Sequence, residues 1–129
     1  MFMKVKDIMT TRVISIESRK TIGDALDLMV ENNVRRLPVL ANGALIGMIV
    51  QHDIEKALRS PEFVCETPVD WVMTKNVITV AAQTDLLEAI NLLLKHKISG
   101  MPVMENGLMI GIISETDILK LCIELLNRP

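Results

Sequence analysis

The chain has 129 residues, of which half are hydrophobic but only 2% are aromatic, and its formal net charge is −2. The core must therefore be aliphatic, and the charge argues against nucleic acid or an anionic membrane as a partner. The apolar runs are too short to cross a bilayer, and the first residues carry no secretory signal. Cys65 and Cys122 form no metal or redox motif, so we expect a reduced, cytoplasmic protein without a bound metal, with a single disulfide as the alternative.

An internal repeat organises the chain. Met9-Thr10 recurs 64 residues later as Met73-Thr74, and the same offset still relates Asp53-Ile54 to Asp117-Ile118. A fixed offset without a gap indicates two copies of one supersecondary unit. We assign residues 1–60 to repeat 1 and residues 69–129 to repeat 2, and residues 61–68, which contain two prolines, to a linker.

Each repeat begins with a predicted strand and a predicted helix. Residues 13–16 and 77–80 alternate apolar and polar side chains, which is the period of a strand. Apolar residues then recur at helical spacing over 22–30 and 86–94. Thr21 and Thr84 supply hydroxyls for the two N-caps, and acids follow in the first turn.

A hairpin and a closing helix complete each repeat. Asn42-Gly43 and Asn106-Gly107 each lie between two apolar runs, which is a strong hairpin signal. The predicted strands are 37–40, 45–50, 101–104 and 109–114, and the closing helices are 53–59 and 117–127. The fold class is therefore α+β, with β-α-β-β-α repeats in tandem. Because the strand over 109–113 is apolar on both faces, we expect the repeats to pack face to face.

These features resemble the CBS domain family, named after cystathionine β-synthase. The family's signs are a start such as Asp7-Ile8-Met9-Thr10, a hydrophobic-x-x-hydrophobic-Pro-Val segment and a Gly-x-x-[Ser/Thr]-x-x-Asp segment before a helix. Residues 34–39 and 98–103 match the second sign, and residues 111–117 match the third. Residues 47–53 match the third sign except that Val50 replaces the hydroxyl residue.

The resemblance covers about residues 5–126 and implies a pseudo-twofold Bateman module with two clefts. It implies a regulatory adenosine ligand, namely AMP, ADP, ATP or S-adenosylmethionine, and no required cofactor. It also implies a homodimer and control of an effector protein on a separate chain.

The strongest candidate for a ligand contact is Asp117, which follows a strand and opens a helix. Its carboxylate is expected to accept hydrogen bonds from both ribose hydroxyls, with Ser114 and Thr116 beside it. The alternative is a structural acid that the helix dipole favours without any ligand. Because a helix start is normally exposed, we expect Asp117→Ala to cost the fold little. Asp53 offers a second ribose position, where Val50 cannot donate the matching hydrogen bond.

Basic residues of repeat 1 are candidates for phosphate contacts. Arg35 and Arg36 suit phosphate oxygens, and a solvated basic pair is the alternative. His52 is a candidate for a phosphate contact in its protonated form, and an exposed structural role is again the alternative. Ser99 is the small, uncharged counterpart of Arg35 in repeat 2.

The resemblance also places apolar residues around the ligand. Val34 and Ile98 are expected to lie on the two faces of the adenine ring. The cleft is also expected to contain Thr10, Thr74 and Pro102.

Two other functions stay open. One is an interaction or oligomerisation module without a ligand, which the Val50 departure favours. An enzyme is the weaker alternative, because the chain has no Tyr, two histidines and no local catalytic motif. We therefore expect no catalytic residues.

The last predicted helix carries the argument for a homodimer. Residues 118–126 are apolar around more than one face, and such an excess must be covered. A twofold contact of this helix with its copy is the simplest cover, with Leu121 and Leu125 in the contact.

Overall fold

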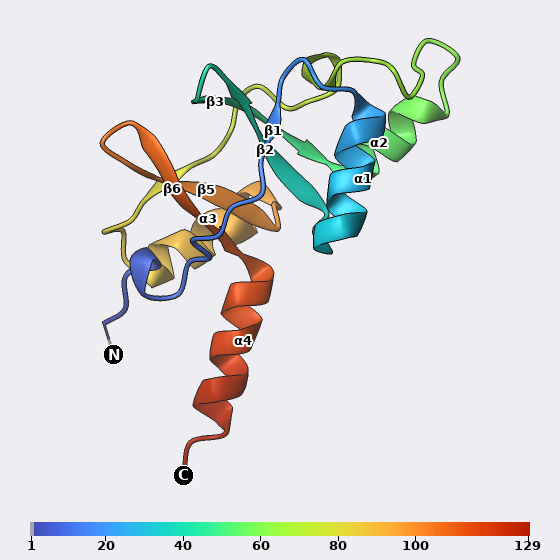
Figure 1. Cartoon of the computed structure of the whole chain (residues 1–129). Coiled ribbons are helices and arrows are strands. Elements are labelled where there is room, and N and C mark those ends of the chain that lie inside the picture. The colour runs from blue at the N-terminus through green and yellow to red at the C-terminus, as the bar shows by residue number, and fades with distance from the viewer. Residues whose placement is uncertain (1) are drawn as a thin grey trace. The chain divides into compact units, whose positions relative to one another are not determined.

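The computed structural model describes residues 2–129, and over these residues it contains four α-helices and two three-stranded sheets (Figure 1). The order of the elements confirms two α+β repeats of the β-α-β-β-α type. The chain packs as two compact units that do not coincide with the two sequence repeats. Unit 1 contains the described residues up to Val13 together with Ile78–Pro129, and unit 2 contains Ile14–Val77.

Unit 2 is built on a sheet of β1 (Ile16–Glu17), β2 (Arg36–Ala41) and β3 (Ala44–Val50). β1 pairs with β2 in parallel, and β2 pairs with β3 antiparallel. The helices α1 (Ile22–Asn32) and α2 (Gln51–Leu58) lie side by side next to this sheet (Figure 1). The core is aliphatic, as the composition predicts, and its fully buried side chains include Ile22, Leu37, Ile49 and Ile54.

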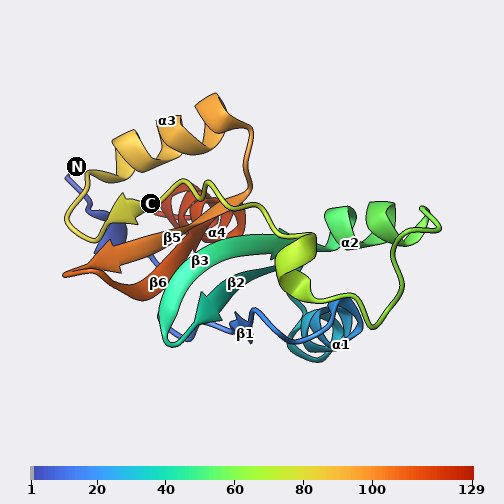
Figure 2. The same ribbon diagram turned by 90° about the horizontal axis from the view of Figure 1, so that it is seen from above.

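Unit 1 repeats this arrangement with β4 (Val80–Ala81), β5 (Gly100–Glu105) and β6 (Leu108–Ser114). The helix α3 (Leu86–His96) runs alongside β5 and β6 (Figure 2). Both predicted hairpins are confirmed, since Asn42, Gly43, Asn106 and Gly107 all have positive φ. Glycine and asparagine tolerate this left-handed region better than other residues do.

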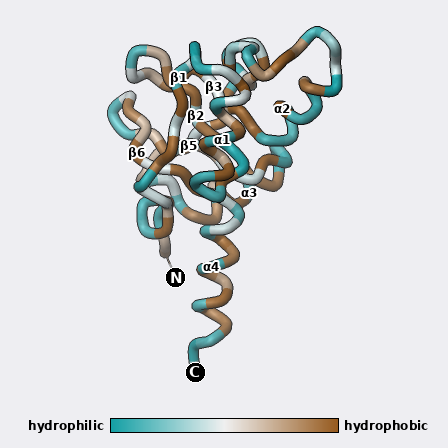
Figure 3. The backbone as a smooth tube through the Cα atoms, turned by 45° about the vertical axis from the view of Figure 1, so that its right-hand side comes forward, coloured by the Kyte–Doolittle hydropathy of each residue, from teal (hydrophilic) through white to brown (hydrophobic). Residues whose placement is uncertain are grey.

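The helix α4 (Glu115–Leu126) differs from the other helices because none of its residues is buried. It extends away from the β5–β6 hairpin of its own unit (Figure 1). Apolar segments recur along its whole length (Figure 3). No helix within residues 2–129 combines the length and the apolar character needed to cross a membrane.

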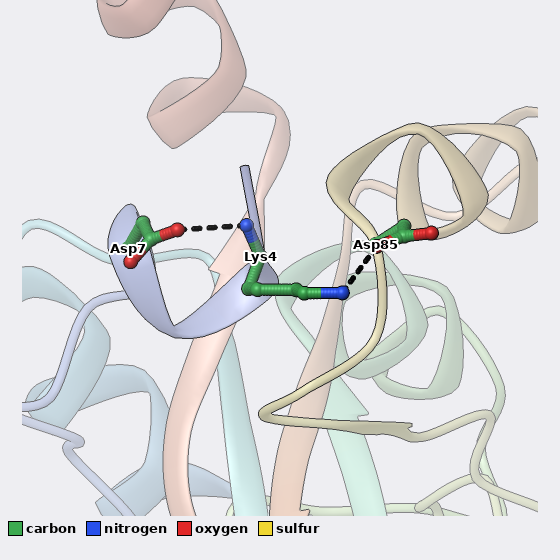
Figure 4. Close-up of polar contacts among 3 residues, drawn as sticks. All are labelled: Lys4, Asp7 and Asp85. Atoms are coloured by element: carbon green, nitrogen blue, oxygen red, sulfur yellow. Dashed lines mark hydrogen bonds and ion pairs between the residues drawn. The ribbon is translucent and has the colours of Figure 1, made fainter. Parts of the chain in front are cut away.

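The N-terminal segment (residues 2–13) belongs to unit 1 because its backbone pairs with that unit. The Val5 N–H donates to the Thr84 carbonyl at 2.9 Å, and Thr10 and Ile112 exchange two backbone hydrogen bonds of 2.8 and 2.9 Å. The Lys4 ammonium group also pairs with Asp85 at 2.6 Å (Figure 4). In unit 2 the segment around Thr74 pairs with Met48 in the same way.

Glycine makes both of these crossings possible. A Cβ atom at Gly111 would lie 2.8 Å from Met9 Sδ and 2.9 Å from the Thr10 carbonyl oxygen. At Gly47 a Cβ atom would overlap Met73 Sδ and approach the Thr74 carbonyl oxygen to 2.9 Å. The Met-Thr pairs of the sequence are therefore the segments that cross a glycine of β3 or β6.

Some predicted boundaries are wrong. The first strand of each repeat covers 16–17 and 80–81 instead of 13–16 and 77–80, since only these residues reach a partner strand. Thr84 is not the N-cap of α3, because Asp85 takes that position. The closing helices begin at Gln51 and Glu115, two residues earlier than predicted.

Candidate functional site

The candidate site in unit 1 centres on the carboxylate of Asp117, in the first turn of α4. Asp117 Oδ2 accepts hydrogen bonds from the Ser114 N–H at 2.9 Å and from the Ser114 hydroxyl at 3.0 Å. Asp117 Oδ1 accepts one from the Thr10 hydroxyl at 2.9 Å. Three donors therefore fix the orientation of one half-buried carboxylate.

Ser114 and Asp117 together form a capping box at the start of α4. The Asp117 N–H points to the Ser114 hydroxyl at 3.4 Å, while the Asp117 side chain accepts from the Ser114 N–H. This reciprocal pair satisfies two N–H groups that lack partners within the helix. The structural role that we weighed for Asp117 is therefore real, and our expectation of an exposed residue that is cheap to replace does not fit these contacts.

Thr10 reaches Asp117 from the other end of the chain. Its backbone is held against Ile112 of β6, and its side chain then lies over the start of α4. The resemblance assigned Thr10 to the ligand site, but its hydrogen bond to Asp117 could not be derived from the sequence. The recurrence of Met-Thr at the same distance before each Asp matches Thr10 with Asp53 and Thr74 with Asp117, so it does not predict the contact that the structure shows.

The matching position in unit 2, at the start of α2, has fewer side-chain hydrogen bonds. Val50 is the N-cap of α2 and makes no side-chain capping bond. Thr74 pairs with Met48 through its backbone, as Thr10 does with Ile112. Within residues 2–129, however, the Asp53 carboxylate accepts no hydrogen bond from Thr74 or from any other residue. Val50 lacks the hydroxyl that Ser114 donates, and Asp53 makes none of the three hydrogen bonds that orient Asp117.

The basic residues of repeat 1 lie near the start of α2. The Arg35 carbonyl accepts the Gln51 N–H at 2.8 Å, and Arg36 lies opposite Val50 in the sheet. His52 is exposed on the first turn of this helix. In unit 1 the Ser99 carbonyl accepts the Glu115 N–H at 2.9 Å, so Ser99 holds the place of Arg35.

The remaining candidates are spread over the two units. Val34 and Ile98 are half-buried, and each packs against the core of its own unit. Pro102 is fully buried in β5, and Thr116 is exposed on the first turn of α4. A shallow cavity of about 330 Å³ along α3 is lined by other residues: Asp85, Leu87, Glu88, Asn91, Leu92 and Lys95.

The family model for the CBS domain matches residues 5–60 and 69–124 of the chain. The CBS domain-containing protein YhcV of Bacillus subtilis is 32% identical over 114 residues, covering 88% of this chain and 81% of the relative. The homoserine O-acetyltransferase of Methanococcus vannielii is 37% identical over 117 residues. The match covers 88% of this chain but only 24% of that acetyltransferase.

Two solved structures resemble the chain over nearly its whole length. The CBS domain pair of protein MJ0100, in complex with 5′-methylthioadenosine and S-adenosyl-L-methionine, is 29% identical with a TM-score of 0.88. This match covers 97% of our chain and 99% of that one. CBSX2 in complex with AMP is 27% identical with a TM-score of 0.85, covering 96% and 98% of the two chains. The chain therefore belongs to the CBS domain family and consists of a pair of CBS domains, the arrangement known as a Bateman module.

Proposed function

We propose that this protein is a regulatory module that binds an adenosine-containing ligand through Asp117. The observation that carries the proposal is the Asp117 carboxylate, which Ser114 and Thr10 hold in a fixed direction. A fixed carboxylate is well suited to the two hydroxyls of a ribose, because charge-assisted hydrogen bonds are strong and directional. The complexes of MJ0100 and CBSX2 with adenosine compounds support the same ligand class.

The ligand itself is AMP, ADP, ATP or S-adenosylmethionine, since all four carry the same adenosine. Arg35, Arg36 and His52 are the proposed phosphate contacts, and their positions near the start of α2 support this role. Val34, Ile98, Ser99, Pro102, Thr116 and Asp53 remain proposed contacts. If Arg35 meets a phosphate, Arg35→Ser should weaken ATP more than adenosine.

We further propose that the protein regulates an effector protein and is not itself an enzyme. Its match to about a quarter of an acetyltransferase supports a module that accompanies a catalytic part in such relatives. Two free, exposed cysteines support the reducing environment of the cytoplasm. The alternative without a ligand is favoured at Asp53, whose carboxylate has no ordering contact within residues 2–129.

The proposed function is tested by calorimetry with AMP, ADP, ATP and S-adenosylmethionine on protein stripped of bound nucleotide. Asp117→Asn should weaken the preferred ligand about ten- to hundredfold, because a hydrogen bond to a charged group is lost. Asp53→Asn is the matched control and should change the affinity less. Unchanged affinity in Asp117→Asn, with a folded protein, would disprove the site.

We also propose a homodimer through α4. Ile118 and Leu121 pack against the core of unit 1, whereas Leu119, Ile123 and Leu126 remain 63%, 61% and 84% exposed. These three residues form a second stripe on the helix, because they are spaced four and three residues apart. We call Leu119, Ile123 and Leu126 the outer stripe of α4.

Repeat 1 lacks this stripe at the same positions. The counterparts of Leu119, Ile123 and Leu126 are Glu55, Arg59 and Glu62. Unit 1 also exposes Leu87 and Leu94 on α3, which are 71% and 72% exposed. A second copy of unit 1 supplies a surface of the same kind, which supports a twofold contact.

A further inference from the structure

The Asp117 carboxylate is already largely occupied before any ligand binds. A carboxylate has about four lone-pair sites, two on each oxygen. The Ser114 N–H and hydroxyl fill both sites of Oδ2, and the Thr10 hydroxyl fills one site of Oδ1. One site is left, whereas a ribose that binds through both hydroxyls needs two. One of the three donors must therefore leave when such a ribose binds.

The Ser114 donors are the harder ones to displace. The Ser114 N–H is a backbone group whose direction is fixed at the junction of β6 and α4. The Ser114 hydroxyl lies between the Asp117 carboxylate and the Asp117 N–H, and Ser114 is only 9% exposed. Their loss would also remove the cap of α4.

The Thr10 hydroxyl is the donor that can leave. Thr10 is exposed, and its position depends on two backbone bonds to Ile112 and not on its side chain. A rotation about its Cα–Cβ bond moves the hydroxyl away from Asp117 while the backbone stays in place. The exposed hydroxyl then finds water as a new partner.

We infer that Thr10 is a specificity-determining residue that competes with the ribose for Asp117 Oδ1. This inference rests on the proposed function of Asp117. A ligand with both hydroxyls displaces Thr10, whereas a 2′-deoxy ligand donates a single bond and fits the one free site. Thr10 therefore lowers the affinity for ribonucleotides and leaves that for deoxyribonucleotides unchanged, which raises the ligand concentration at which the module responds.

The test is calorimetry of wild type and Thr10→Val with AMP and with 2′-deoxy-AMP. Valine keeps the shape of threonine but removes the donor. Thr10→Val should bind AMP about three- to tenfold more tightly and should leave 2′-deoxy-AMP affinity unchanged, since a charge-assisted bond no longer has to break. Thr74→Val is the matched control, because Thr74 makes the same backbone pairing without a hydrogen bond to Asp53.

The outcomes separate this inference from the proposed function. Weaker AMP binding in Thr10→Val would make Thr10 a ligand contact and overturn the inference, while the function at Asp117 stands. An equal change for AMP and 2′-deoxy-AMP would overturn it as well. A wild-type protein that binds none of AMP, ADP, ATP and S-adenosylmethionine would remove the proposed function, and the inference with it.

Discussion

At the scale of single residues, Gly111 decides whether the N-terminal segment can cross β6. A methyl group there would meet Met9 Sδ and the Thr10 carbonyl oxygen, and this carbonyl is held by a backbone bond to Ile112. The sulfur of a flexible side chain can move, but the backbone oxygen cannot move without breaking that pairing. The need for glycine therefore comes from a contact with a segment about 100 residues away, which explains why sequence patterning alone could not reveal it.

We predict that Gly111→Ala destabilises the protein by about 1–3 kcal/mol through this overlap. Amide hydrogen exchange should be faster than in the wild type at Thr10 and Ile112, because these two amides form the backbone hydrogen bonds of the crossing. Gly107→Ala is the control: it strains a positive φ of 78° but meets nothing within 4 Å. Equal exchange of the two amides in both variants would contradict the crossing as the cause.

Asp24, in the first turn of α1, is a single residue whose lowered pKa makes the stability of the fold depend on pH. Hydrogen bonds from the Thr21 main-chain N–H, at 3.1 Å, and from the Thr21 side chain hold the pKa of Asp24 below its usual value of 3.8. A lowered folded pKa means that the charged form stabilises the fold above the unfolded pKa. This contribution is lost as the pH falls through the folded pKa.

We predict that Asp24→Asn lowers the melting temperature at pH 7 and that the difference from wild type shrinks as the pH falls through the folded pKa of Asp24. Thermal unfolding followed by circular dichroism between pH 2.5 and 7 measures it. Asp27→Asn, on an exposed position of the same helix, should show little difference at any pH. If the difference in melting temperature persisted at the lowest pH, Asp24→Asn would destabilise the helix for a reason other than the lost charge.

At the scale of elements, local patterns predicted more than distant pairing did. The helices, the hairpins and the Asn-Gly turns follow from signals a few residues apart, and the structure confirms them. The two-residue strands β1 and β4 were misplaced, because their bounds depend on partner strands more than 20 residues away. The Ser114–Asp117 capping box was readable as Ser-x-x-Asp, whereas its contact with Thr10 was not.

The helix α2 begins at Val50 without a side-chain cap, and a hydroxyl residue there should supply one. Val50→Ser should restore the capping box with Asp53 and stabilise α2 by about 0.5–1 kcal/mol. An oriented Asp53 should also strengthen ligand binding in unit 2, so we expect the AMP stoichiometry in calorimetry to rise. The stability part is checked by urea unfolding, and Ser114→Ala should show the opposite effect on α4.

The structure also changes which residues of α4 test the dimer. Leu121 packs against the core of unit 1, so Leu121→Glu would disturb the fold and not only an interface. The sequence could not separate the two apolar faces of this helix, because both have helical spacing. Their exposure distinguishes the two faces. The outer stripe is exposed and can contact another molecule, whereas Ile118 and Leu121 pack against the core of unit 1.

At the scale of the whole molecule, we predict that the protein is a dimer of twice 14.4 kDa by light scattering at micromolar concentration. Leu119→Glu combined with Ile123→Arg copies the residues of repeat 1 and should weaken the dimer at least a hundredfold, since about 1.5–3 kcal/mol is lost per buried side chain. At protein concentrations low enough for the wild type to be monomeric, the melting temperatures of the variant and the wild type should differ little.

The matched control is Glu55→Ala in α2 combined with Arg59→Ala at the C-cap of that helix, the counterparts of Leu119 and Ile123. This variant should remain a dimer. A dimer that survives both changes on α4 would place the interface elsewhere. A wild-type protein that is monomeric would contradict the homodimer.

The division of the chain into units also bears on how the protein emerges from the ribosome. All residues of unit 2 lie in one continuous stretch, so this unit can fold as soon as residue 77 is outside. Residues 2–13 must wait for β6 and α4, which at about 5–20 residues per second takes on the order of ten seconds. During that time Met3, Val5 and Met9 have no core to enter. Residues 2–13 are thus made before unit 2 but become native after it, and in this interval they are open to chaperones and to the same segment of a neighbouring nascent chain.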